Sequence, residues 1–191
     1  IRRNYDNMRL GIYVGSFDPV HKGHKKIVDY LIDNNYVDKV LVIPTGTYWD
    51  KTGIIPVNYR IDMWNYYKSD SIIIDNRYND LEYTYMILDK LERECDDELY
   101  LIIGADNVIS FDKWKNYQEI LERKILVIPR ENIEIDKYFC KYKKRGNFIV
   151  VEGFKEVDIS SREIRKLLHD GKYNVVEKYL DKEIIEYIEK N

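Results

Sequence analysis

The sequence predicts an α/β fold in which an open, mainly parallel sheet carries helices on both faces and the C-terminal end of the chain is helical. Three observations indicate this fold. The strand-like segments are short and rich in β-branched residues, they are apolar almost without interruption, and they alternate with segments of helical periodicity. Strands that are apolar on both faces are typical of parallel sheets covered by helices on both sides.

Each expected strand is a short apolar run that ends at a turn signal. The first run is followed by a turn-rich stretch that reaches Pro19, the second ends at Pro44 and the fourth ends at Gly104. Such runs between glycine- and proline-containing turns favour buried strands. The expected strands cover residues 10–14, 40–43, 72–74, 99–103, 125–128 and 148–151.

Helical periodicity fills the intervals between these strands. Ile27, Val28 and Leu31 lie on one face of a helix expected over residues 25–31. Further helices are expected over residues 85–94, 114–123 and in the C-terminal part from about residue 160. The alternation predicts a Rossmann-like sheet, which binds ligands beyond the carboxyl ends of its strands at a topological switch point.

Length and composition favour one cytoplasmic domain over residues 1–191, in which residues 1–7 are a possible extension before Met8. The net charge of −3 disfavours a nucleic-acid-binding protein, and the basic run 141–145 is interpreted as a solvated loop. No apolar run approaches the ~20 residues of a membrane helix. Cys95 and Cys140 are far apart in the sequence, so we expect reduced thiols and no metal site.

Residues 15–24, which read Gly-Ser-Phe-Asp-Pro-Val-His-Lys-Gly-His, follow the first strand and open a helix. Gly15 allows the backbone to approach a ligand closely. The amides of a helix start favour a phosphate, and His21 and His24 can add hydrogen bonds there, with positive charge when protonated. The alternative is that both histidines face solvent. Neither the P-loop pattern nor the Gly-x-Gly-x-x-Gly pattern is present.

Two later loops add donors and acceptors that suit a nucleotide. Gly104 and Asp106 follow the fourth strand, where a carboxylate can accept hydrogen bonds from ribose hydroxyls; the alternative is a plain strand-to-helix turn. Ser160, Ser161 and Arg165 follow the sixth strand. Ser160 with Glu163 also fits a capping box, and this structural role is compatible with phosphate binding.

These segments resemble the paired signatures of the nucleotidylyltransferase superfamily, namely His-x-Gly-His at residues 21–24 and Ser-Ser-x-x-Ile-Arg at residues 160–165. Within it, the chain is most similar to the bacterial nicotinate-nucleotide adenylyltransferases, from about Met8 to the end. The further matching segments are Pro44-Thr45 followed by Lys51, residues 60–63, Tyr83-Thr84, residues 102–107 and residues 111–115.

The resemblance implies transfer of AMP from ATP to nicotinate mononucleotide, which gives deamido-NAD and pyrophosphate, with Mg²⁺ accompanying ATP. It implies that His24 contacts the α-phosphate and that His21 and Arg165 hold the outer phosphates. The residues implied to bind ATP are Gly15, Ser16, Phe17, His21, His24, Gly104, Asp106, Ser160, Ser161 and Arg165. Those implied to bind the mononucleotide are Lys51, Tyr83, Thr84 and Trp114.

The sequence departs from the family pattern on the side of the mononucleotide. Residues 48–51 read Tyr-Trp-Asp-Lys where the family often has Pro-Pro-His-Lys, and Glu82 stands where it often has Ser. The nicotinate and nicotinamide rings therefore both remain open as acceptors, as do a mobile lid at residues 48–51, the oligomeric state and a plain core role for Trp114. The alternative functions are transfer to another phosphorylated acceptor and a non-catalytic nucleotide-binding module.

Overall fold

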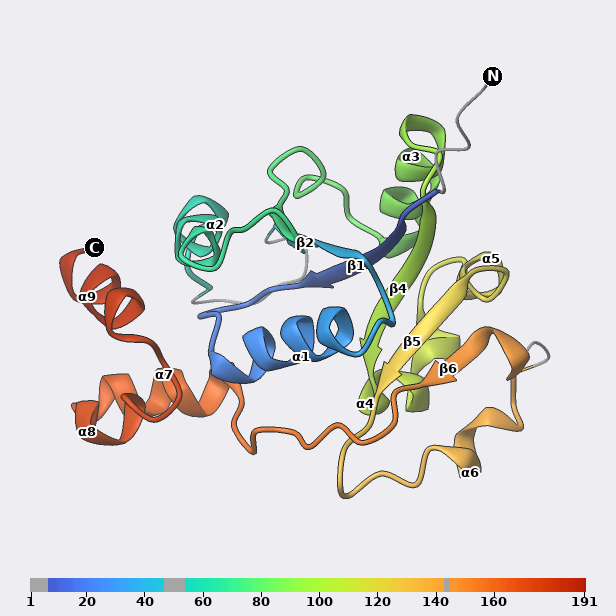
Figure 1. Cartoon of the computed structure of the whole chain (residues 1–191). Helices are drawn as coiled ribbons and strands as arrows, with labels where there is room; N and C mark the ends of the chain where they lie inside the picture. The colour runs from blue at the N-terminus through green and yellow to red at the C-terminus, as the bar shows by residue number, and fades with distance from the viewer. Residues whose placement is uncertain (1–6, 47–53, 143–144) are drawn as a thin grey trace.

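The computed structural model describes residues 7–46, 54–142 and 145–191. Among these residues, six strands form one parallel sheet in the order β3-β2-β1-β4-β5-β6. β1 lies in the middle of the sheet, and β2 and β3 extend the sheet from it to one edge. The chain then crosses to the other side of β1, where β4, β5 and β6 extend the sheet to the opposite edge (Figure 1). This is the strand order of the Rossmann fold, and the switch point lies between β1 and β4.

The elements have the following bounds. The strands are β1 Arg9–Gly15, β2 Lys39–Pro44, β3 Ile72–Ile74, β4 Glu98–Gly104, β5 Lys124–Ile128 and β6 Phe148–Val150. The helices are α1 Lys22–Asp33, α2 Val57–Asn65, α3 Thr84–Glu94, α4 Ala105–Ile109, α5 Tyr117–Ile120, α6 Asp136–Phe139, α7 Ser161–His169, α8 Tyr173–Val176 and α9 Lys182–Lys190. Short 3₁₀ turns are η1 Phe111–Lys113 and η2 Arg145–Asn147.

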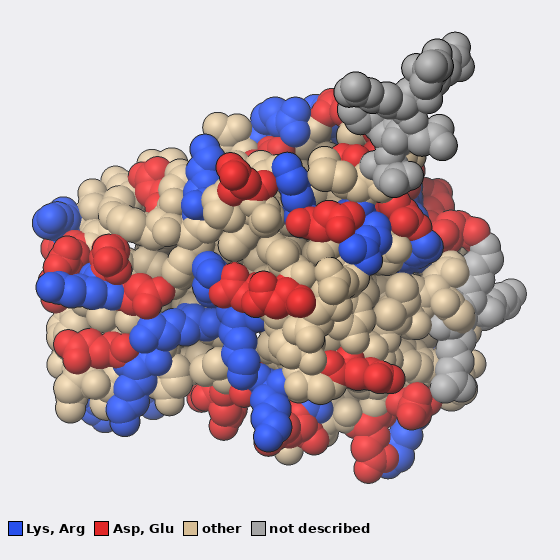
Figure 2. Space-filling model, in the orientation of Figure 1, with Lys and Arg blue, Asp and Glu red and all other residues tan. Residues whose placement is uncertain are grey.

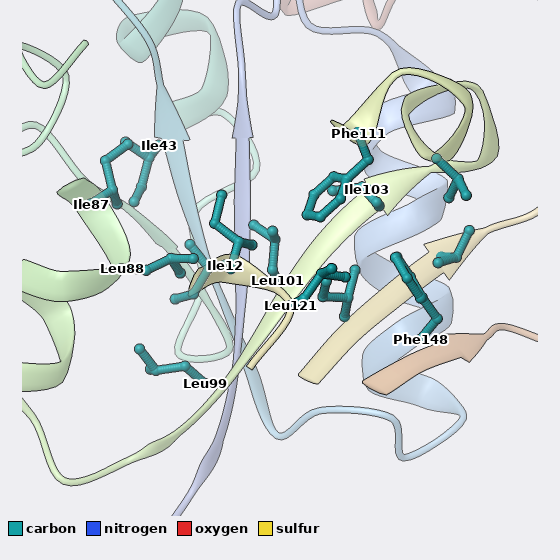
Figure 3. Packing of buried hydrophobic residues seen from close by; sticks show 14 of the residues in the cluster. Ile12, Ile43, Ile87, Leu88, Leu99, Leu101, Ile103, Phe111, Leu121 and Phe148 are labelled. Atoms are coloured by element: carbon teal, nitrogen blue, oxygen red, sulfur yellow. The ribbon is translucent and has the colours of Figure 1, made fainter. Parts of the chain in front are cut away.

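Alternate residues of the strands point into two separate apolar cores. Ile12 and Leu101 belong to a core on one face with side chains of α3, α4 and α5, and part of this core is drawn in Figure 3. Tyr13 and Ile102 belong to a core on the other face with side chains of α1, α2 and α7 to α9. Since successive strand residues face opposite sides, helices on both faces of the sheet are confirmed.

The strand predictions agree with the structure to within one or two residues at each end, but the helix expected over residues 114–123 is confirmed only in part, over Tyr117–Ile120. The 3₁₀ turn η1 ends at Lys113, before this range, and the single helical turn α5 begins only at Tyr117. Asn116 adopts a left-handed conformation with φ of 54°, so residues 114–116 form a turn, closed by a 3.2 Å hydrogen bond from the Tyr117 N–H to the Trp114 carbonyl, and not the start of an α-helix. The helices α2, α4 and α6 were not predicted.

Acidic and basic side chains are mixed over the face of the molecule shown in Figure 2. Within the basic run, Lys141 donates a hydrogen bond to the carbonyl of Ile109 and pairs with Asp112 at 3.1 Å. The neighbouring Tyr142 is buried, and its hydroxyl donates to the carbonyl of Val108. The start of this run therefore packs against α4 and is not a freely solvated loop. Among the described residues, no helix is long and apolar enough to cross a membrane.

Candidate functional site

A cavity of about 420 Å³ lies beyond the carboxyl ends of β1 and β4, at the switch point of the sheet. Its walls come from the loop after β1, the start of α1, the loops after β4 and β5, and the start of α7. Most of the residues predicted to bind ATP or the mononucleotide line it, namely Gly15, Ser16, Phe17, His21, His24, Thr84, Gly104, Asp106, Trp114, Ser160 and Ser161. Segments distant in the sequence thus meet around one space of the size typical of small-molecule sites.

Three predicted residues are not among those that line this cavity in the described part of the chain. Lys51, with the proposed lid at residues 48–51, lies outside the described residues. Tyr83 lines a second cavity that adjoins the first. Arg165 does not line the main cavity, because its Nη1 donates a 2.6 Å hydrogen bond to the backbone carbonyl of Asp18.

The two histidines form the N-terminal cap of α1. His21 is the N-cap residue, and its Nδ1 accepts a 3.0 Å hydrogen bond from the backbone N–H of Gly23. In return, Nδ1 of His24 accepts a 3.1 Å hydrogen bond from the backbone N–H of His21. This is a capping box made by two imidazoles, which satisfies two amides that would otherwise lack a helical partner. The alternative in which both histidines simply face solvent is therefore wrong.

The capping contacts determine which ring nitrogen carries the proton. A backbone N–H can only donate, so Nδ1 of each ring is an acceptor and is unprotonated. In a neutral imidazole the proton then resides on Nε2. The rings stack with centroids 3.7 Å apart, and both line the cavity. The helix cap thus leaves each Nε2–H as a hydrogen-bond donor for a ligand.

Both rings are neutral at physiological pH. Burial, and secondarily the positive charge of Arg130, lowers the pKa of His21 to about 4. Burial likewise lowers the pKa of His24 well below its ordinary value, with smaller contributions from His21 and Arg130. The sequence expectation of positive charge at this pair is corrected accordingly, since a cationic imidazole is disfavoured where little water reaches it. The pair can contribute hydrogen bonds but no net charge.

The lowered pKa of His21 makes stability depend on pH. The unfolded chain binds a proton at His21 near pH 6.5, whereas the folded chain does so only near pH 4, so stability falls as the pH drops through this interval. We expect the free energy of unfolding to lose about 2 kcal/mol from this residue between pH 7 and pH 5. Urea unfolding at both pH values measures this loss.

The control is His21→Asn, which retains an N-cap acceptor but does not titrate. Its loss of stability between the same two pH values should be smaller by about 2 kcal/mol. An identical loss in both proteins would contradict a lowered pKa at this position.

The backbone of the loop before α1 is strained where it passes the cavity. Phe17 adopts a left-handed conformation with φ of 48°, which is uncommon for a residue with a side chain. Its ring lies 5.0 Å from that of His24 and 5.1 Å from that of Trp64, so packing holds it in place. Gly23 cannot carry a side chain here, because a Cβ would stand 2.8 Å from the ring of His21. Strain held in place by packing is typical of functional loops.

The start of α7 is hydrogen-bonded to the loop after β1, more than 140 residues earlier in the chain. The hydroxyl of Ser161 donates to the carbonyl of Pro19 at 2.9 Å, and Arg165 donates to that of Asp18. The capping box of Ser160 with Glu163 is confirmed, because each side chain accepts from the backbone N–H of the other residue. Arg165 and Ser161 thus hold the two motifs together.

One cationic residue of the cavity was missed in the sequence. Arg130 follows β5 and lines the cavity, where its Nε donates to Asp106 at 2.9 Å and its Nη1 to Glu156 at 3.4 Å. Its guanidinium is half-exposed, so both ion pairs are open to solvent and to ligands. Among the described residues that line this cavity, Arg130 is the one Lys or Arg. The signal was its place directly after the fifth strand, where a parallel sheet binds ligands.

Arg60 of α2 is a second residue that sequence reasoning did not place. Its side chain is fully buried beneath the loop after β1, where Nη1 donates to the carbonyl of Ser16 at 2.6 Å and Nε to that of Ile55 at 2.8 Å. Burial lowers its pKa, and the charge of Asp18 partly opposes this effect. Arg60 therefore joins the loop to the segment that leads into α2, and its sequence context carried no signal for this.

We expect Arg60→Met to destabilise the protein by about 3 kcal/mol, because the carbonyls of Ser16 and Ile55 lose a charged donor in a partly buried position. Arg60→Lys is the comparison variant, since its single ammonium cannot reproduce the planar fork and should recover only part of the loss. Urea unfolding of the three proteins tests this order. A fully stable Arg60→Met protein would contradict it.

Comparison with known proteins agrees with this geometry. The family model described as cytidylyltransferase-like matches residues 12–167, which includes the strained loop, the histidine cap and the start of α7. The chain belongs to this family. It is 34% identical over 174 residues to a protein of Azobacteroides pseudotrichonymphae named "Probable nicotinate-nucleotide adenylyltransferase", covering 86% of this chain and 89% of the relative.

A Fusobacterium nucleatum protein of the same name is 34% identical over 197 residues, covering 94% of this chain and all of the relative. Among cytidylyltransferase-like proteins, this chain is thus a member of the nicotinate-nucleotide adenylyltransferases. The Plasmodium falciparum nicotinic acid mononucleotide adenylyltransferase complexed with NaAD has the same fold, with a TM-score of 0.82 at 23% identity over 96% of this chain and 95% of that one. The Rossmann-like fold prediction is confirmed.

Proposed function

We propose that the protein transfers the adenylyl group of ATP to nicotinate mononucleotide, giving deamido-NAD and pyrophosphate. The observation that carries this proposal is the pair of neutral imidazoles at the start of α1, which line the cavity at the switch point while the helix cap occupies their Nδ1 atoms and leaves Nε2–H as the donor. The names of the curated relatives agree with it. A Plasmodium falciparum enzyme of the same fold is complexed with NaAD in one structure and with APC in another.

The reaction is a direct displacement at phosphorus. An oxygen of the mononucleotide phosphate forms a bond to the α-phosphorus of ATP, and the bond from that phosphorus to the bridging oxygen of the β-phosphate breaks. The electron pair leaves with pyrophosphate. The nucleophile is already an anion near neutral pH, so the protein needs no general base. Its task is to position two anions and to stabilise the charge that develops on the departing oxygen.

The residues divide this task as follows in our proposal. The Nε2–H of His24 donates to the α-phosphate, while His21 and the start of α7 hold the outer phosphates. Arg130 provides positive charge for the phosphates, which His21 and His24 cannot do while neutral. Asp106 accepts hydrogen bonds from a ribose once the ligand displaces its ion pair with Arg130. Arg165 contributes by positioning the loop through Asp18.

Mg²⁺ enters this scheme with the triphosphate, as part of the substrate. Such an ion takes most of its ligands from phosphates and water, and needs at most one or two carboxylates of the protein. Asp106 and Glu156 are the carboxylates that line the cavity among the described residues, and both are paired with Arg130. Among the same residues, no group of three or more potential ligands is arranged to hold a metal. The cavity therefore suits a metal that arrives on ATP.

The experiment is a panel of acceptors with Mg-ATP and with Mg-CTP, followed by the release of pyrophosphate and by identification of the product. Nicotinate mononucleotide with ATP should give the highest kcat/KM, and deamido-NAD should accumulate. Nicotinamide mononucleotide and phosphorylated small alcohols complete the panel. Turnover of another acceptor, with none of nicotinate mononucleotide, would replace the proposed substrate. Binding of ATP without turnover of any acceptor would favour a non-catalytic nucleotide-binding module.

A further inference from the structure

The segment between α8 and α9 is joined to the start of α1, where the two histidines form the helix cap. Figure 1 shows α7, α8 and α9 at the end of the molecule where α1 begins. Lys22, which lies between His21 and Gly23, donates its backbone N–H to the carbonyl of Tyr179 at 2.8 Å. Its Nζ donates to the carbonyl of Glu177 at 3.3 Å. One residue of the histidine motif is thus held, through both its backbone and its side chain, by a segment distant in the sequence.

Asp181 completes this connection with its carboxylate. It is the N-cap residue of α9, which lies wholly within the described residues, yet its carboxylate makes no capping hydrogen bond to the amides of this helix. Instead, Oδ2 accepts a hydrogen bond from the hydroxyl of Tyr67, and Oδ1 lies 3.9 Å from Nζ of Lys22. An aspartate at an N-cap ordinarily bonds to its own helix. The side chain of Asp181 therefore serves contacts with distant residues and not the local cap.

Tyr67 fixes the other side of this carboxylate. Its ring packs against that of Trp64 at a centroid distance of 5.9 Å, and Trp64 is fully buried. Burial, followed by the hydrogen bond to Asp181, raises the pKa of Tyr67, so the hydroxyl remains a donor at neutral pH. The ring of Trp64 in turn lies 6.4 Å from that of His24. Asp181 is thus bound to an aromatic cluster that also contacts the histidine cap.

The backbone amides at the start of α1 all have acceptors within the protein. The N–H of His21 donates to His24, and that of Gly23 donates to His21. The N–H of Lys22, which lies between them, donates to Tyr179. A phosphate would have to displace an internal acceptor to reach any of these amides. The start of α1 therefore depends on the Nε2–H groups of its two rings to bind a ligand, and the orientation of these rings becomes decisive.

We infer that residues 177–181 form a strap that orients the histidine cap, and that Lys22, Asp181 and Tyr67 are positioning residues for the adenylyl transfer. None of these three belongs to the described residues that line the main cavity, so they act through the histidines. The inference deepens the proposed function and rests on it for its effect on the rate. A displacement of about 1 Å at a reacting centre can lower a rate by a factor of about 100.

Lys22→Pro tests the backbone hydrogen bond to the strap directly. Proline lacks the N–H, yet it is favoured at the first position of a helix, and the extended conformation of His21 suits a proline that follows it. We expect kcat to fall about 30-fold, with KM for ATP and for the mononucleotide changed by no more than about twofold. Lys22→Ala keeps the N–H and loses only the contacts of Nζ, so its kcat should fall by only about threefold.

Two tyrosines separate positioning from a general effect on stability. Tyr67→Phe removes the hydroxyl that holds Asp181. Tyr187→Phe is the matched control, because it removes a 2.7 Å hydrogen bond from α9 to Asp62 of α2 and does not involve Lys22. Both variants should lose a similar free energy of unfolding in urea. Only Tyr67→Phe should also lower kcat, by about fivefold.

NMR of the ring nitrogens of the free protein reports on the cap without any substrate. In the unchanged protein, Nδ1 of His21 and of His24 accepts from a backbone N–H, so both rings should show the Nε2–H tautomer. In Lys22→Pro the signals should shift toward a mixture of tautomers. The pKa of His21 should also rise from about 4, because water reaches the ring. Tyr187→Phe should give the signals of the unchanged protein.

Three outcomes would overturn the inference while the proposed function stands. They are an unchanged kcat in Lys22→Pro, a loss that appears in KM alone, and an equal loss of kcat in Tyr67→Phe and Tyr187→Phe. If Lys22→Pro does not fold, the comparison of the two tyrosine variants decides. If the unchanged protein transferred AMP to no mononucleotide, the proposed function would fail, and the ring signals would still show whether the strap orients the cap.

Discussion

Replacement of His24 by alanine is expected to lower kcat about 100-fold or more, with little change in the KM for ATP. The loss of one preorganised donor to a transition state typically has an effect of this size. Nδ1 of His24 accepts from the backbone N–H of His21, so Nε2–H is the donor that this ring can offer to a ligand in the cavity. Since the ring is neutral, this donor should remain effective from pH 6 to pH 8 without a titration step. Steady-state kinetics at several pH values measures both effects.

Two further variants separate catalysis by His24 from its role in the helix cap. His24→Gln keeps an N–H donor near the position of Nε2 and should recover part of kcat. His24→Asn keeps an acceptor near Nδ1, so it should fold stably but remain as slow as the alanine variant. The exposed His169 is the matched control, and His169→Ala should leave kcat unchanged. Near-normal turnover of His24→Ala would refute the proposed role.

Neutralising Arg130 is expected to lower kcat/KM by a factor of about 100 to 1,000 in the variant Arg130→Gln. Both reactants are anions, and the lowered pKa of His21 and of His24 removes these rings as sources of positive charge. Arg130 is the one Lys or Arg among the described residues that line the main cavity. Its guanidinium is half-exposed where it pairs with Asp106 and Glu156, so a phosphate can compete for it.

Arg130→Lys retains the charge but not the planar fork, so it should recover only part of the activity. Arg93→Gln on α3 is the control, because this exposed arginine lines neither cavity. Measuring KM separately for ATP and for the mononucleotide shows which phosphate Arg130 contacts. A second consequence concerns His21: without the cation, its pKa should rise, and NMR titration of its ring measures this change. An Arg130→Gln protein as active as the control would refute the assignment.

The strands could be predicted because the pattern that marks them, a short and uninterrupted apolar run, is visible in the local sequence. A run such as residues 99–103 is buried on both faces of a parallel sheet, so almost every position is apolar and the pattern is unambiguous. The helix α2 lacked such a pattern. Its buried face includes Arg60 beside Met63 and Trp64. A buried arginine is stable only where other groups accept hydrogen bonds from its guanidinium, and here the carbonyls of Ser16 and Ile55 do so. The sequence carries no local sign of those carbonyls.

The partial error at residues 114–123 has a related cause. Tyr117 and Ile120 have helical spacing, but Trp114 packs on Phe111 and Asn116 adopts a left-handed conformation before the helix begins. Tertiary packing thus overrides a helical propensity that is weak in so short a segment. This same departure from the helix places Trp114 between the two cavities.

The sequence by itself determined the succession of strands and helices along the chain. It also determined which loops carry the site, with the histidines at residues 21 and 24 and the serines at residues 160 and 161. Those features follow from periodicity and turn chemistry, which act between near neighbours in the chain. Only the tertiary structure decided that the histidines are neutral with Nδ1 occupied, that Arg165 binds the loop, and that Arg130 lines the cavity. Protonation and hydrogen-bond partners depend on burial and on charges brought from distant segments, and these exist only once the chain has folded.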